Sequence, residues 1–342
     1  MSLFRTEIFQ QPAAAAEMLR GARAEAEAAA AAIRAHRPPA LLITARGSSD
    51  HAATYAKYLF ETRNRLPVIL AAPSVFGVYR QPPRIAPLAV LGISQSGASP
   101  DVVGVLEEGR RQGSVTVAIT GPAPSRLARA AAHRIRLRGG RELSVPASKT
   151  YSGSLLAVAL LSQALDPDPA FEAALAQVPE ALATALGLEH QLEAAVASLR
   201  GQRLAVLGRG YNLATALEIG LKLMETCYVV AEARSVADFL HGPIATVEPG
   251  FPVLLIEAVG PARRQLRELG RRVERAGARV VTISDRPTGA VGDPVMVRTG
   301  LPESLTPLPY VVAGQLLALR MAQLLGIDSD RPRGLEKVTE TR

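Results

Sequence analysis

The sequence predicts an α/β protein of two similar domains, each a parallel β-sheet covered by helices on both faces in the doubly wound, flavodoxin-like arrangement. Apolar Val/Ile/Leu runs alternate with helical patterns, and an apolar run that ends in Arg-Gly occurs twice, at residues 41–47 and 204–210. Residues 111–120 and 275–284 form a second similar pair. Strands of a parallel sheet read as unbroken apolar runs because crossover helices bury both faces. Each half is therefore expected to contain four strands separated by helices.

The spacing between the two halves is nearly constant. Arg46 and Arg209 lie 163 positions apart, and Gly113 and Gly277 lie 164 positions apart. Sheets of this kind bind ligands beyond the carboxyl ends of their strands. The functional residues should therefore lie in the loops that follow the apolar runs.

Proline-rich breaks divide the chain into segments. An Ala-rich helical stretch ends at Pro38-Pro39, and Asp166-Pro-Asp-Pro169 separates the two halves; prolines at such positions stop helices. The predicted segments are a helical segment at 1–36, a first domain at 37–167, a helical linker at 168–196, a second domain at 197–325 and a tail at 326–342.

Composition narrows the classes of function. The 342 residues, 48% apolar and 20% charged, can bury two domain-sized cores. Cys227 is the single cysteine and no Cys/His cluster has ligand spacing, so we expect no disulfide, metal or redox cofactor. The net charge of +8 is dispersed and aromatics make up 4%, which argues against nucleic acid. No apolar stretch approaches the ~20 residues of a membrane span and no targeting segment is evident, so a cytoplasmic protein is expected.

Lysine is rare in this chain. Only Lys57, Lys149, Lys222 and Lys337 stand against 35 arginines. Unlike arginine, a desolvated lysine can lose its proton and attack a carbonyl carbon. Lys337 lies in a polar tail where packing gives little reason to prefer lysine over arginine, so it is a candidate for carbonyl chemistry. The alternative is a surface lysine without a special role that remains in an arginine-rich chain.

A serine-rich loop follows the apolar run at residues 88–93. It reads Ser94-Gln-Ser-Gly-Ala-Ser99 and leads into a helical pattern at 102–111, with Ser99 as a good N-cap and Pro100 at the first helical position. Hydroxyls, a permissive glycine and free amide hydrogens at a helix start together suit a phosphate. Neither a Walker lysine nor a dinucleotide fingerprint is present. The alternative is a serine turn with an ordinary cap.

Acid, base and amine groups gather in the second half. Glu218, Lys222 and Glu225 share one face of a predicted helix at spacings of four and three, within an otherwise apolar segment. A carboxylate beside a lysine in a partly dry site can shuttle protons. His241 precedes a Gly-Pro turn and could titrate near neutral pH. Most such trios are solvated pairs on a helix surface, and most lone histidines are structural.

These motifs resemble the SIS (sugar isomerase) superfamily, and within it the isomerase half of glucosamine-6-phosphate synthase and the stand-alone glucosamine-6-phosphate deaminases. The resemblance covers nearly the whole chain. It rests on motifs in the same order: Glu7-Ile-Phe-Gln-Gln-Pro12, Arg46-Gly-Ser-Ser-Asp-His-Ala52, Ser94-Gln-Ser-Gly97, Glu142-Leu-Ser-Val-Pro-Ala-Ser-Lys149, Leu207-Gly-Arg-Gly210, Leu221-Lys-Leu-Met-Glu225, His241-Gly-Pro243 and Pro332-Arg-Gly-Leu-Glu-Lys337.

The resemblance implies a fold of two SIS domains and a role for each candidate residue. Glu225 would move a proton between C1 and C2 of a hexose 6-phosphate. His241, supplied by the neighbouring subunit of a homodimer, would assist ring opening, and Lys337 would engage the open-chain carbonyl. The implied substrate-binding residues, which include the phosphate-binding serines, are Ser49, Ser94, Gln95, Ser96, Ser99, Ser148 and Lys222. Ala147 departs from the pattern, because the synthase has a serine there.

The resemblance also bears on the direction of the reaction. The synthase carries an N-terminal glutaminase domain, whereas this sequence starts at the isomerase portion. We therefore expect isomerising deamination of a hexosamine 6-phosphate, in the first instance glucosamine 6-phosphate, with no cofactor. Two alternatives are an isomerising transaminase module that receives ammonia from elsewhere and a non-catalytic phosphosugar-binding regulator. The sequence does not say which sugar epimer is used.

Overall fold

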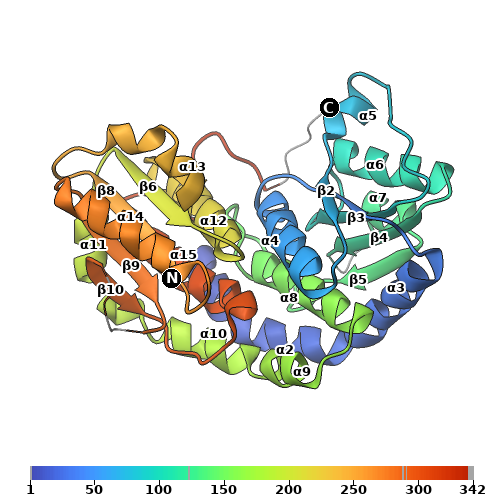
Figure 1. Ribbon diagram of the computed structural model, residues 1–342, viewed down its shortest axis with the longest axis horizontal. Helices are drawn as coiled ribbons and strands as arrows, with labels where there is room; N and C mark the ends of the chain where they lie inside the picture. Colours follow the sequence, from blue (N-terminus) through green and yellow to red (C-terminus); the bar gives the residue numbers. More distant parts are fainter. Residues whose placement is uncertain (1, 122–123, 287–288, 290, 338–342) are drawn as a thin grey trace. The chain divides into compact units, whose positions relative to one another are not determined.

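The computed structural model describes residues 2–121, 124–286, 289 and 291–337. The chain forms two compact units. We call them the first module, made of residues 13–142, 149–176 and 336–337, and the second module, made of residues 2–12, 143–148 and 177–335 (Figure 1). Each contains one five-stranded parallel sheet with helices against it.

In the first module the strand order is β2-β1-β3-β4-β5. Its strands are β1 (Leu41–Thr44), β2 (Val68–Leu70), β3 (Ala89–Ser94), β4 (Val115–Thr120) and β5 (His133–Arg136). Its helices are α3 (Arg23–His36), α4 (Ser48–Arg63), α5 (Pro73–Gly77), α6 (Pro100–Arg111), α7 (Arg126–Ala130), α8 (Lys149–Leu165) and α9 (Pro169–Ala176), together with most of α2 (Gln11–Gly21).

In the second module the strand order is β10-β9-β8-β6-β7. Its strands are β6 (Arg203–Gly208), β7 (Val230–Ser235), β8 (Pro252–Glu257), β9 (Arg279–Ser284) and β10 (Asp293–Met296). Its helices are α1 (Leu3–Phe9), α10 (Val178–Leu186), α11 (Glu193–Leu199), α12 (Asn212–Cys227), α13 (Val236–Leu240), α14 (Arg263–Arg275) and α15 (Pro307–Leu324), with 3-10 turns η1 (Glu189–Gln191), η2 (Pro243–Thr246) and η3 (Glu303–Leu305).

The sequence prediction of two doubly wound parallel sheets is confirmed. Within each sheet the chain order of the strands is the same, and the register repeats as well. Ala89 pairs with Val115 in the first module, and Pro252 pairs with Arg279 in the second. The apolar run at residues 88–93 forms most of β3, and both β3 and its counterpart β8 are buried along their whole length.

Each sheet has one strand more than expected, β2 and β7. Both lie at a sheet edge. Only Val68 is buried among the three residues of β2, and β7 carries Glu232 and Arg234 beside one buried residue, Ala231. An edge strand buries little apolar surface, so a search for unbroken apolar runs does not find it.

No helix among the described residues is long and apolar enough to cross a bilayer. Within that same part of the chain, no three His, Cys, Asp or Glu side chains are grouped so that they could hold a metal ion.

Candidate functional site

The serine turn of the first module follows β3. Ser94 is 6% exposed at the end of this strand, and its Oγ accepts from the Gly97 amide at 3.1 Å. Ser96 Oγ accepts from the Ala98 amide at 3.2 Å. Ser99 is the N-cap residue of α6, with Pro100 at the first helical position as expected, but its hydroxyl makes no capping bond. The helix start therefore keeps amide hydrogens and a hydroxyl that can serve an anion.

Gly97 fixes the shape of this turn. Its φ is +60°, and an added Cβ would collide with Ser125 and lie 2.7 Å from Thr120 Oγ1. The Gly97 carbonyl also accepts from the Leu127 amide at 3.0 Å, which ties the turn to α7. The turn is thus shaped by backbone contacts that a side chain would disrupt.

The Gly97→Ala variant is expected to bind inorganic phosphate at the serine turn at least ~10-fold more weakly than the unchanged chain, because a left-handed alanine is strained by ~1–3 kcal/mol and its Cβ pushes the turn away from α7. Titration calorimetry measures the affinity. Gly113→Ala, also at positive φ but with open space around its Cβ, is the control for backbone strain alone. Equal weakening in both variants would contradict a specific role for the turn.

Ser49 lies in the first turn of α4, directly after β1. Strands β1 and β3 are neighbours. The chain order reverses at this point of the sheet, which is where doubly wound sheets bind ligands. Arg46, also at the end of β1, donates from Nε to Asp101 of α6 at 2.6 Å. Ser49 and the serine turn therefore follow adjacent strand ends, and an ion pair links the two connections.

The second module has a different residue at the position equivalent to Ser94. The matching strand end is Glu257, which is fully buried. Its Oε1 accepts from Arg263 Nε at 2.7 Å and from Arg267 Nε at 3.0 Å. Here the chain supplies its own anion where the first module has a hydroxyl.

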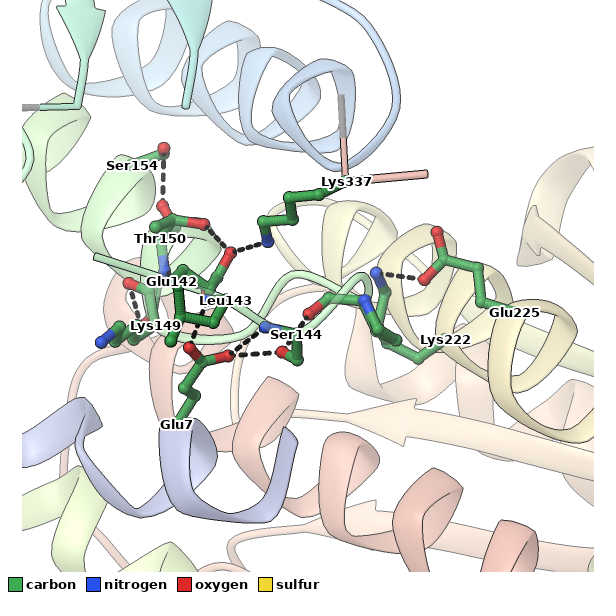
Figure 2. Close-up of polar contacts among 12 residues, drawn as sticks. Glu7, Glu142, Leu143, Ser144, Lys149, Thr150, Ser154, Lys222, Glu225 and Lys337 are labelled. Atoms are coloured by element: carbon green, nitrogen blue, oxygen red, sulfur yellow. Dashed lines mark hydrogen bonds and ion pairs between the residues drawn. The ribbon is translucent and has the colours of Figure 1, made fainter. Parts of the chain in front are cut away.

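Helix α12 brings Glu218, Lys222 and Glu225 together, as the spacing predicts. The side chains of Glu218 and Lys222 are 0% exposed, and that of Glu225 is 18% exposed. Lys222 Nζ lies 3.4 Å from Glu218 Oε1. It lies 2.5 Å from Glu225 Oε2 (Figure 2). The buried ammonium therefore lies between two carboxylates, of which only Glu225 reaches solvent.

This arrangement suits a proton-transfer base. Lys222 holds one oxygen of Glu225 in place, while part of the carboxylate stays accessible. A neighbouring cation favours the ionised form of a carboxylate, and the contact gives the carboxylate a defined direction; abstraction of a carbon-bound proton requires both. The trio is a buried cluster rather than the solvated surface pair that the spacing also allowed.

The single thiol lies at the end of the same helix. Burial raises the pKa of Cys227 to about 11, and the neighbouring Thr226 hydroxyl offsets only part of that effect. Its Sγ donates to the Ala318 carbonyl oxygen at 3.3 Å. At neutral pH this cysteine is a packed thiol and not a nucleophile.

His241 directly follows α13 and is exposed. Gly242 behind it has φ +146°, so the chain turns sharply into η2. The imidazole lines a hollow of the second module together with Arg209 and Arg272. The structure therefore places His241 on a surface turn of the module that carries Glu225.

Lys337 lies within the first module. Its Nζ donates to Glu142 Oε2 at 2.7 Å, and the side chain is 23% exposed (Figure 2). The side chain of Glu142 is 0% exposed and also accepts from the Thr150 amide at 3.1 Å and from Thr150 Oγ1 at 2.6 Å. Thr150 is in the first turn of α8, so a buried carboxylate anchors the tail lysine to the start of that helix.

Glu142 was missed as a site residue, although the motif that contains it was noted. An acidic residue ahead of Leu-Ser-Val-Pro was the available signal, since a carboxylate in so apolar a stretch needs a buried partner. Ser148, at the other end of that motif, is fully buried just before α8 and belongs to the second module.

Two parallel α/β sheets of the same strand order place the chain among proteins with two doubly wound domains, and the chain belongs to the SIS domain family. The model of that family matches residues 36–164 and 200–299.

Similar sequences come from larger proteins. The chain is 30% identical over 341 residues to the isomerizing glutamine-fructose-6-phosphate aminotransferase of Pyrococcus horikoshii, and 31% identical over 345 residues to that of Thermococcus kodakarensis. Each match covers 97% of this chain and 56% of the relative. The chain thus spans about half the length of these relatives.

Solved structures give the same fold. A candidate phosphosugar isomerase from Silicibacter pomeroyi is 35% identical with a TM-score of 0.86, covering 96% of this chain and 100% of that one. The C-terminal domain of glucosamine-fructose-6-phosphate aminotransferase from Francisella tularensis is 22% identical with a TM-score of 0.89, covering 97% and 98%. Glucosamine-6-phosphate deaminase from Thermotoga maritima is 20% identical with a TM-score of 0.71, covering 96% and 100%.

Proposed function

We propose that this protein catalyses isomerising deamination of a hexosamine 6-phosphate: glucosamine 6-phosphate and water give the ketose 6-phosphate and ammonia. The observation that carries the proposal is the Glu225 carboxylate, held by fully buried Lys222 and partly open to solvent. Aldose-ketose interconversion needs one base that removes a proton from C2 and returns it to C1, and a fixed carboxylate of this kind performs both steps.

The proton and nitrogen balance follows from this role. His241 assists opening of the sugar ring. Glu225 then removes the C2 proton and delivers it to C1, while a second proton passes from the amino nitrogen to the C1 oxygen; the amino aldehyde becomes an imine at C2 with a hydroxyl on C1. Water adds to that imine and ammonia leaves, so no electrons are gained or lost and no cofactor is needed. Lys337 engages the carbonyl of the open chain, and the serine turn with Ser49 binds the phosphate.

The aminotransferase direction is the second candidate. The relatives that are 30–31% identical carry that name, which favours synthesis from fructose 6-phosphate. Ammonia would then add at C2 and Glu225 would move the proton from C1 to C2. The chemistry of the carboxylate is the same in both directions.

Two assays decide between the candidates. Ammonia release from glucosamine 6-phosphate is followed without any nitrogen donor, and hexosamine formation is followed from fructose 6-phosphate with ammonium or with glutamine. We expect ammonia release, with the galactosamine epimer run in parallel to test substrate choice. Formation of hexosamine with ammonium but no release favours the synthetic direction. Binding of sugar phosphate without turnover in either assay contradicts both candidates and identifies a regulator.

The Lys337→Arg variant is expected to lower kcat by ~100-fold or more while it keeps phosphate affinity. Arginine preserves the positive charge beside Glu142 but cannot add to a carbonyl carbon at neutral pH. Steady-state kinetics and phosphate titration give the two quantities. Retention of full kcat would show that Lys337 acts only as a cation.

We also propose a homodimer in which His241 of the partner subunit serves Glu225. Glu225→Gln and His241→Asn homodimers are expected to be inactive alone. After mixing and subunit exchange, heterodimers contain one unimpaired site, so about a quarter of the normal activity should return. Sedimentation velocity checks the dimer, and the absence of recovered activity after exchange contradicts the shared site.

A further inference from the structure

The second module contains a hollow of ≈ 440 Å³ at the carboxyl ends of its strands. Its apolar lining residues are Val236 and Leu240 of α13 and Leu269 of α14. Its polar lining residues include Arg209, His241 and Arg272. Apart from His241, the proposed reaction uses none of these residues.

The position of the hollow is the usual ligand position of a doubly wound sheet. Arg209 follows β6, α14 follows β8 and α13 follows β7 (Figure 1). Strand β6 lies between β8 and β7, so the order of the chain reverses here. Ligands bind such sheets outside the strand ends at this reversal. In the first module the serine turn occupies the corresponding place.

The internal repeat shows what differs between the two modules. The buried positions of α14 are those of α6 shifted by 164: Val102, Val105, Leu106 and Gly109 correspond to Leu266, Leu269, Gly270 and Val273. By the same shift Asp101 corresponds to Gln265. Asp101 binds Arg46 at 2.6 Å in the first module, whereas the neutral Gln265 lines the hollow beside Arg209 in the second.

Arg209 has therefore lost its carboxylate partner. In the part of the chain that the structure describes, the side chains of Arg209, His241 and Arg272 make no hydrogen bond or ion pair. The one acidic residue in the lining, Glu268, accepts from Arg264 at 2.7 Å. Two unpaired guanidinium groups thus face one hollow, and guanidinium binds phosphate with two parallel hydrogen bonds.

We propose that this hollow is a second anion site, separate from the serine turn, which binds the phosphate of a small phosphorylated metabolite through Arg209 and Arg272. Its volume lies within the range of small-molecule sites. The apolar lining residues Val236, Leu240 and Leu269 accept the less polar part of the ligand. A ligand bound here also contacts the turn of His241, which links its presence to the step that His241 performs.

Equilibrium dialysis of the full chain against radiolabelled inorganic phosphate tests the site. The unchanged chain is expected to bind two phosphates. Gln265→Asp recreates the acidic partner that Asp101 provides in the first module, and should weaken one of the two sites by about tenfold or more. Arg272→Gln should do the same, whereas Arg275→Gln, three residues along the same helix and outside the lining, should have no effect.

Substitution of Ser96 and Ser99 by alanine distinguishes this inference from the proposed function. That double variant should lose the phosphate bound at the serine turn and keep the phosphate bound in the hollow. If the unchanged chain binds a single phosphate and Gln265→Asp weakens it, the second anion site is supported and phosphate binding at the serine turn is contradicted. If neither Gln265→Asp nor Arg272→Gln alters stoichiometry or affinity, or if no phosphate binds, the inference is overturned.

Competition identifies the class of metabolite. A hexose 6-phosphate and a nucleoside monophosphate are each titrated against labelled phosphate bound to the Ser96/Ser99 double variant, in which the second site alone remains. Displacement by either one supports the assignment and names the class. Displacement by neither overturns the assignment to a phosphate ester.

Discussion

The Glu225→Gln variant is expected to lose turnover by ~10²–10⁴-fold, the usual contribution of a general base. Glutamine has the shape of glutamate and can still accept a hydrogen bond from Lys222, which lies 2.5 Å from Glu225 Oε2. It cannot remove a proton from carbon. The substitution therefore removes the chemistry while the packing of α12 stays nearly the same.

Two readouts separate this effect from misfolding. Phosphate affinity should be unchanged, because the serine turn belongs to the first module and Glu225 belongs to the second. Exchange of the C2 proton with deuterated solvent, followed by NMR, should disappear together with turnover. A variant that keeps more than a tenth of the normal rate would contradict the assignment of Glu225 as the base.

The Lys222→Met variant is expected to lower the free energy of unfolding by ~3–5 kcal/mol, the cost of breaking a buried ion pair by removing one partner. Methionine fills a similar volume but leaves the Glu218 carboxylate, which is 0% exposed, without its ammonium neighbour. Urea denaturation monitored by circular dichroism measures the change. Activity should fall as well, since Glu225 loses the group that holds it.

The chain offers a matched control on another helix. Lys57 and Glu61 have the same lysine-glutamate chemistry at a spacing of four, but their side chains are 39% and 37% exposed. Lys57→Met should therefore change stability by ~1 kcal/mol or less. Equal losses for the two lysine variants would show that burial of the α12 cluster is not what makes it costly to break.

The architecture could be predicted from sequence because its signal is repeated. The two apolar runs that end in Arg-Gly contain β1 and β6, and the similar segments at Gly113 and Gly277 lead into β4 and β9. The face shared by Glu218, Lys222 and Glu225 was also predictable, because helical spacing determines which side chains are neighbours. Local periodicity is enough for both.

Long-range pairings were not predictable in the same way. Glu142 and Lys337 are 195 positions apart, and no local sequence pattern predicts that the tail lysine pairs with a buried carboxylate. The exchange of Asp101 for Gln265 is visible in the sequence but acquires meaning only when Arg46 and Arg209 are seen beside these residues. Edge strand β7 was not predicted, because its polar residues interrupt the apolar run by which a strand is recognised.

Glu257 has a consequence for the history of the two halves. Where the first module has Ser94, the second module has a buried carboxylate that pairs with Arg263 and Arg267, so its turn after β8 cannot bind an anion in the way proposed for the serine turn. In the proposed function, phosphate binding at the serine turn and proton transfer at carbon therefore belong to separate copies of the repeat. Laboratory evolution should accordingly find mutations that retune affinity around the serine turn and mutations that retune rate along α12, with little epistasis between the two groups.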